Sequence, residues 1–207
     1  MLDNNGFDLW ADGYDKSVGV SDEENTYPFA GYKAVLGTIY KTIMEKPNAV
    51  VLDIGFGTGT LTTKLYENGC TIYGQDFSVR MIELASEKMP DAHLYQGDFT
   101  QGLVVPLQAQ SYDFIVATYS LHHLTDEQKV SFLRVLQGLL NPGGKILIGD
   151  VAFETQNQLE QCQKAAGDEW DEDEIYFIVD ELKQYLPTLG FTQCSHCAGV
   201  LTIPTRI

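Results

Sequence analysis

Acidic residues and glycines follow apolar runs in the first half of the chain, and their spacing is typical of a small-molecule site. Asp53 lies near the end of the apolar run that begins at Ala49, and Gly55, Gly57 and Gly59 follow at alternate positions. Glycine is needed where the backbone turns sharply or where a ligand approaches it closely. A buried strand, a glycine turn and a helix in this order predict a ligand site in a doubly wound α/β sheet.

The glycine spacing narrows the kind of ligand. Thr60 stands where a dinucleotide fingerprint has its third glycine, and no Lys followed by Ser or Thr comes after the last glycine, as a phosphate loop requires. The pattern therefore favours a ligand without a phosphate. A tight strand-to-helix turn that binds no ligand remains the alternative.

Two further carboxylates follow the next two predicted strands. Asp76 ends the strand 71–75, and an ionised carboxylate at that place can accept hydrogen bonds from both hydroxyls of a ribose. Asp98 and Phe99 follow the strand 93–96, where an acid and an aromatic ring suit an adenine. The simpler alternatives are a helix-dipole charge for Asp76 and an ordinary turn for Asp98.

The elements that would position these residues alternate between strand and helix. Apolar residues at helical spacing predict helices over 29–44, 60–68, 154–166 and 175–186. Ser78 is a predicted N-cap, and residues 125–128 form a predicted capping box for a helix that runs to about residue 140. Further strands are expected over 112–117, 145–149, 192–196 and 200–204. No repeat or linker divides the chain, so one domain over residues 1–207 is expected.

Five motifs in this order resemble the class I S-adenosylmethionine-dependent methyltransferases, and the pattern is most similar to their YrrT-like group. The likeness covers roughly residues 7–150. The motifs are Asp53-x-Gly55-x-Gly57-x-Gly59, Tyr73-Gly74-Gln75-Asp76, Gly97-Asp98-Phe99, Ser120-Leu121-His122-His123-Leu124-Thr125-Asp126 and Leu140-Asn141-Pro142-Gly143-Gly144-Lys145.

The resemblance implies a three-layer αβα fold around a seven-stranded, mostly parallel sheet of order 3-2-1-4-5-7-6, with the seventh strand antiparallel. Residues 1–45 would form a helical cap over the site. The cofactor would be S-adenosylmethionine, and the residues expected to bind it are Tyr14, Asp53, Gly55, Gly57, Gly59, Asp76, Phe77, Asp98, Phe99 and Thr118. The residues expected around the acceptor are Trp10, Tyr119, His122 and Tyr176.

The expected reaction is methyl transfer to a small molecule by direct displacement. His122 is the candidate general base, since histidine titrates in the right range. No carboxylate near it in sequence obviously orients it, so we favour a role in shaping the pocket. Two alternatives stay open: a non-catalytic protein that binds the cofactor, and, less favoured, an NAD-dependent oxidoreductase.

Composition and charge limit the partners. A net charge of −16 argues against nucleic acid, and no apolar run is long enough to span a membrane. The first residues do not resemble a signal peptide, so a cytoplasmic monomer or homodimer with reduced cysteines is expected. Cys194-Ser195-His196-Cys197 has no second ligand pair in the sequence, so no metal site is expected.

Overall fold

The computed structural model describes residues 25–206, so the predictions for Trp10 and Tyr14 lie outside the described residues. The helices are α2 (Tyr32–Met44), α3 (Thr60–Glu67), α4 (Val79–Lys88), α5 (Val105–Gln108), α6 (Asp126–Gln137), α7 (Gln156–Ala166) and α8 (Val179–Leu182), with 3-10 turns η1 (Phe99–Gln101), η2 (Leu121–His123) and η3 (Gly167–Glu169). The strands are β1 (Val50–Ile54), β2 (Thr71–Asp76), β3 (His93–Gln96), β4 (Tyr112–Thr118), β5 (Leu140–Phe153), β6 (Phe177–Ile178), β7 (Gly190–Gln193) and β8 (Ala198–Pro204).

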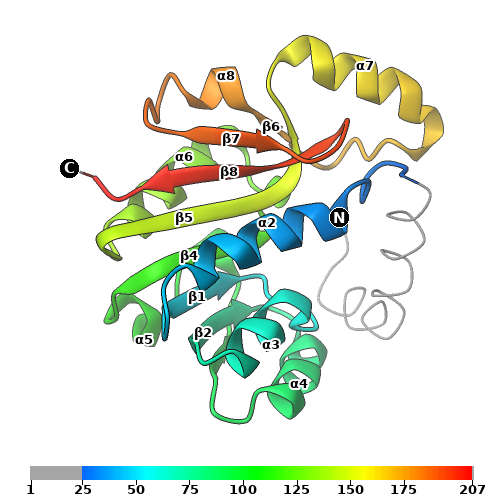
Figure 1. Ribbon diagram of the computed structural model, residues 1–207. Helices are drawn as coiled ribbons and strands as arrows, with labels where there is room; N and C mark the ends of the chain where they lie inside the picture. The colour runs from blue at the N-terminus through cyan, green and yellow to red at the C-terminus, as the bar shows by residue number, and fades with distance from the viewer. Residues whose placement is uncertain (1–24, 207) are drawn as a thin grey trace.

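The sheet has the order β3-β2-β1-β4-β5-β8-β7 (Figure 1). The first five strands in this order pair in parallel, and β8 is antiparallel to both β5 and β7. The predicted order is confirmed once β8 is counted as the family's seventh strand and β7 as its sixth. The two-residue strand β6 is an addition that pairs with the end of β5.

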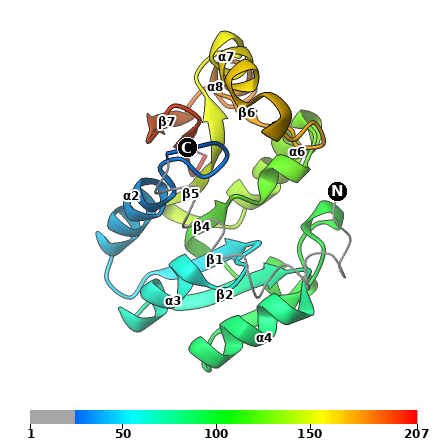
Figure 2. The same ribbon diagram turned by 90° about the vertical axis from the view of Figure 1, so that its right-hand side faces the viewer.

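Helices cover both faces of the sheet and make three layers. Alternate residues of β4 show this: Phe114 and Val116 pack in one apolar cluster, and Ile115 and Ala117 in the other. The first cluster includes residues of α2, α3, α4 and α7, and the second includes residues of α5, α6 and α8. Figure 2 shows α2 and α6 on opposite sides of the strands. This alternation follows from the period-2 geometry of a strand that is buried on both faces.

Both predicted helix starts are confirmed. The Ser78 side chain accepts a hydrogen bond from the backbone N–H of Met81, which begins α4. Thr125 and Gln128 form the reciprocal bonds of a capping box at the start of α6. These caps satisfy backbone donors that would otherwise have no partner in the first turn.

The predicted helix over 175–186 is wrong for most of its length. Phe177 and Ile178 form β6 on the edge of β5, and only Val179–Leu182 is helical. The buried amine of Lys129 donates a hydrogen bond to the carbonyl oxygen of Ile175. This contact holds the start of the segment outside a helix. Apolar residues at 175, 178 and 179 fit a short extended segment followed by one turn as well as they fit a helix.

Candidate active site

A cavity of about 290 Å³ opens where β1, β2, β4 and β5 end. One part, the glycine end, is lined by Asp53, Gly55, Gly57, Thr58, Asp76, Phe77 and Phe99. The other part, the histidine end, is lined by Phe29, Tyr32, Tyr119, His122, His123 and Glu174. Thr118, the last residue of β4, and Ser120, in the loop that leads to His122, also line the cavity. The carboxyl ends of parallel strands are where open α/β sheets bind ligands.

The turn from β1 into α3 follows the local geometry that its glycines predict. Gly55, Gly57 and Gly59 all have positive φ, at 70°, 55° and 78°. A Cβ on Gly55 would lie 2.7 Å from the Cβ of Ser120, whereas a Cβ on Gly57 would meet no atom of the described residues within 4 Å. Gly57 therefore exposes bare backbone to the cavity. Gly59 does not line the cavity. It lies at the start of α3, where it packs near Met89.

Asp53 is a buried carboxylate at the floor of the glycine end. One oxygen accepts a hydrogen bond from the Thr62 hydroxyl, and Oδ1 has no hydrogen-bond partner among the residues that the structure describes. Burial raises the pKa of Asp53 to about 7; the charge of Asp76 adds to this rise, and the Thr62 hydroxyl opposes it. A buried carboxylate in this condition is stabilised by any ligand that brings a positive charge or a hydrogen-bond donor to Oδ1.

Asp76 is held by two backbone donors at the other wall of the glycine end. Its Oδ2 accepts a hydrogen bond of 2.9 Å from Gly57 N, and its Oδ1 accepts one of 2.9 Å from Ser78 N. A carboxylate accepts hydrogen bonds on both oxygens and donates none, so Asp76 in the cavity wall suits a diol ligand. Asp98, by contrast, is exposed, caps Thr100 N, and is not among the cavity-lining residues.

Aromatic rings form one wall of the histidine end. Tyr119 has a left-handed backbone with φ 50°, a conformation that is sparse for bulky residues and concentrated at functional sites. Its ring lies 5.3 Å from that of Phe29 and 5.2 Å from that of Tyr32. Residues that precede and begin α2 thereby meet the loop after β4.

His122 is buried between two carboxylates. Its Nδ1 lies 2.7 Å from Oδ1 of Asp150, and its Nε2 lies 3.3 Å from Oε1 of Glu174. Both carboxylates are distant from His122 in sequence, so the residues near His122 gave no sign of them. The signal for Asp150 was present: β4 pairs with β5 through Thr118 and Gly149, so the residues that follow these two lie side by side.

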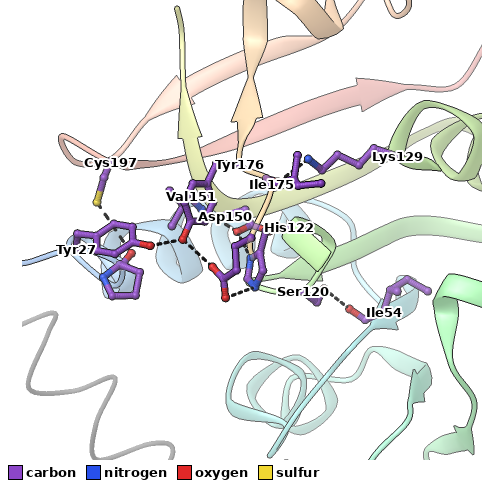
Figure 3. Close-up of polar contacts among 12 residues, drawn as sticks. Tyr27, Ile54, Ser120, His122, Lys129, Asp150, Val151, Ile175, Tyr176 and Cys197 are labelled. Atoms are coloured by element: carbon purple, nitrogen blue, oxygen red, sulfur yellow. Dashed lines mark hydrogen bonds and ion pairs between the residues drawn. The ribbon is translucent and has the colours of Figure 1, made fainter. Parts of the chain in front are cut away.

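A chain of polar contacts holds Glu174 in place. Its Oε2 accepts a hydrogen bond of 2.8 Å from the Tyr176 hydroxyl. The Tyr176 hydroxyl is also hydrogen-bonded to the Tyr27 hydroxyl. Figure 3 shows this connection from Tyr27 through Tyr176 toward His122 and Asp150. The N–H of Ile175 also donates to the carbonyl oxygen of His122. Tyr176 thus supports the site from behind and does not line the cavity.

The charges around the two histidines set opposite protonation preferences. Burial disfavours the charged form of His122, but Asp150 and Glu174 outweigh it and place the pKa of His122 above its ordinary value. Burial and the neighbouring charge of His122 lower the pKa of His123 to about 4. His123 is therefore neutral at pH 7.

The cavity favours cationic ligands. Its lining includes five carboxylates, Asp53, Asp76, Asp171, Asp173 and Glu174, and no Lys or Arg among the described residues. An anionic ligand would meet repulsion from several sides, whereas a cation would be attracted.

A second group of potential ligands lies away from this cavity. Sγ of Cys162 and Cys197 and a ring nitrogen of His196 lie within 4.8 Å of one another. The sequence pointed only to the stretch 194–197. Cys162 lies beside this stretch because α7 packs against the loop before β8. All four cysteines are free thiols.

Comparisons with known proteins agree with the fold and the cavity. The methyltransferase domain family matches residues 51–144. An uncharacterized methyltransferase of Anoxybacillus flavithermus is 39% identical over 193 residues, covering 90% of this chain and 88% of the relative. One of Geobacillus thermodenitrificans is 38% identical, covering 90% and 87%.

Solved structures share the fold. The complex of DhpI with S-adenosylhomocysteine has a TM-score of 0.70 at 17% identity, over 96% of this chain and 93% of that one. The magnesium protoporphyrin IX methyltransferase of Synechocystis with the same bound ligand has a TM-score of 0.67 at 18% identity, over 86% and 85%. The chain belongs to the class I S-adenosylmethionine-dependent methyltransferases, and S-adenosylmethionine is its cofactor.

The residues of the glycine end fit this cofactor. Oδ1 of Asp53 suits the ammonium of its methionine part, the bare backbone at Gly57 allows close approach, and the carboxylate of Asp76 in the cavity wall suits the ribose hydroxyls. The five carboxylates complement the sulfonium charge.

The described part of the chain has no helix long and apolar enough to cross a membrane.

Proposed function

We propose that the protein transfers the methyl group of S-adenosylmethionine to a small-molecule acceptor without phosphate groups, by direct displacement. The observation that carries this proposal is the extension of the cavity from the glycine end into the histidine end. A protein that only bound the cofactor would need no second set of cavity-lining residues beyond it. The carboxylates argue against an acceptor with phosphates, which they would repel.

The residues have separate tasks in this proposal. When bound, S-adenosylmethionine supplies a methyl group activated by a sulfonium sulfur, and displacement leaves neutral S-adenosylhomocysteine. Asp53, Gly57 and Asp76 bind and orient the cofactor. Tyr119 and the rings beside it exclude water and align the acceptor, and such alignment can supply much of a rate acceleration. His122 positions the acceptor end rather than taking its proton, because both ring nitrogens face carboxylates.

A panel of acceptors tests the proposal. The enzyme is incubated with S-adenosylmethionine and alcohols, thiols, amines, their phosphorylated counterparts, RNA or a protein extract, and release of S-adenosylhomocysteine is measured. We expect turnover with a phosphate-free small molecule and at least tenfold lower kcat/KM with its phosphorylated counterpart. Turnover with RNA or protein alone would contradict the proposal. Tight cofactor binding without turnover on any acceptor would favour the non-catalytic alternative.

A further inference from the structure

We propose that His122, His123 and Glu174 bind a divalent transition-metal ion of the Zn²⁺ type at the histidine end of the cavity. One potential ligand atom from each residue lies within 4.8 Å of the other two. Nε2 of His122 and Oε1 of Glu174 are 3.3 Å apart. Two atoms bound to a tetrahedral zinc ion at about 2.1 Å are themselves roughly 3.4 Å apart. This pair therefore already has the spacing of two zinc ligands.

Both of these ligands have the supporting contacts that metal ligands need. Asp150 lies 2.7 Å from Nδ1 of His122, so it fixes the ring with Nε2 facing Glu174. The Tyr176 hydroxyl donates to Oε2 of Glu174 at 2.8 Å, which leaves Oε1 facing His122. A carboxylate behind a ligating histidine and a donor behind a ligating carboxylate are regular features of metal sites.

The third ligand, His123, completes a set of two imidazoles and one carboxylate. Its ring lies 4.4 Å from that of His122, centroid to centroid, and nearly perpendicular to it. Nitrogen donors favour Zn²⁺ and its transition-metal neighbours over Mg²⁺ and Ca²⁺, which prefer oxygen donors. The carboxylates of Asp171 and Asp173, which also line the cavity, offset the added charge.

A site with three protein ligands leaves a coordination position for the acceptor. Its role in the reaction rests on the proposed function, whereas the metal site itself does not. An acceptor that presents a hydroxyl or thiol would bind through that atom, and the ion would lower the pKa of the group. The acceptor proton passes to solvent, the oxygen or sulfur forms a bond to the methyl carbon, and the electrons of the broken carbon–sulfur bond remain on the cofactor sulfur. The acceptor class is thus alcohols or thiols.

Zinc titration against a chromophoric chelator tests the site in the full chain, with the variants Glu174→Gln and His123→Ala. Glu172→Gln is the matched control, since it removes one negative charge from the same acidic loop outside the ligand cluster. We expect about one Zn²⁺ in the wild type, binding at least tenfold weaker in both ligand variants, and affinity within twofold of wild type in the control. Equal zinc affinity in the wild type and both ligand variants, or none in the wild type, would overturn the proposal.

Co²⁺ separates this site from the cluster of Cys162, His196 and Cys197. We expect a cobalt spectrum that lacks thiolate charge-transfer absorption and is lost in Glu174→Gln. A thiolate band that survives in Glu174→Gln, as the only metal signal, would overturn the proposal. Unchanged affinity of both ligand variants for S-adenosylhomocysteine shows that they are folded. Because the titration needs no acceptor, a failed acceptor panel with intact zinc binding would remove the proposed function and leave the metal site standing.

Discussion

At the glycine end of the cavity, Asp53, Gly55 and Gly57 lie within five consecutive positions of one strand and turn. At the histidine end, His122, Asp150 and Glu174 come from η2, the end of β5 and the loop before β6. The first arrangement depends on local backbone geometry, and the second depends on the sheet bringing distant segments together. The difference predicts that substitutions at the two ends have separable effects: cofactor affinity at one, and acceptor turnover at the other.

The largest expected effect is that of Asp53→Asn on stability in the absence of cofactor. The pKa of Asp53 is raised to about 7 in the folded protein, against about 3.9 in an unfolded chain. The folded state therefore holds a proton that the unfolded state loses, so stability falls as pH rises from about 4 to 7. The contribution is on the order of 4 kcal/mol.

Asparagine stays neutral, so Asp53→Asn should remove this fall and be more stable than the wild type at pH 7.5 without cofactor. The same variant should bind S-adenosylmethionine more weakly, because it cannot pair with the ammonium group. Urea unfolding from pH 4 to 8 checks the first point and calorimetry the second. Parallel stability profiles for the two proteins would show that Asp53 is not buried as a neutral acid.

Gly57→Ala should weaken S-adenosylhomocysteine binding by roughly 5–150-fold, because a misplaced methyl group costs about 1–3 kcal/mol. Among residues 25–206 the added Cβ meets no atom within 4 Å, and Gly57 lines the cavity. Gly143→Ala is the matched control, since Gly143 also has a positive φ of 80° and open space around it, and it lies outside the cavity. Both variants should lose similar stability from backbone strain, so equal cofactor affinity in the two would show that Gly57 does not contact the cofactor.

The smallest expected effect is that of Tyr176→Phe at the histidine end. It removes the hydroxyl that links Glu174 to Tyr27, at a cost of about 1 kcal/mol in stability. Acceptor kcat/KM should fall while S-adenosylhomocysteine affinity stays constant, because the hydroxyl lies behind the histidine end. Thermal unfolding and steady-state kinetics measure the two quantities. A change in cofactor affinity of the same size as that in kcat/KM would mean that the two ends are coupled.

The sequence predicted those features that are encoded locally. The turn of Gly55 and Gly57, the N-cap at Ser78 and the capping box at Thr125 each depend on residues within a few positions of one another, and the structure contains all of them. The strand order followed from the resemblance, which rested on these local motifs.

The features that were missed depend on long-range contacts. Glu174 reaches His122 only because Lys129 and the backbone of His122 hold Ile175 in an extended segment, and no periodicity in the sequence encodes that. The contact of Asp150 with His122 could have been predicted from the sequence, because parallel pairing of neighbouring strands places their ends together. The roles predicted for Asp98 and for the cap over residues 1–45 stay predictions.

The most direct measurement is calorimetric titration of S-adenosylhomocysteine into the wild type, Asp76→Asn and Glu174→Gln. Asparagine keeps the size of Asp76 but loses a charged acceptor for the ribose hydroxyls, which should cost about 1.5–3 kcal/mol of binding. Glu174→Gln also replaces a carboxylate by an amide of the same size, at the histidine end. It should leave the affinity for S-adenosylhomocysteine within twofold of wild type. An equal loss of affinity in both variants, or a loss in Glu174→Gln alone, would contradict the division of the cavity into a cofactor end and an acceptor end.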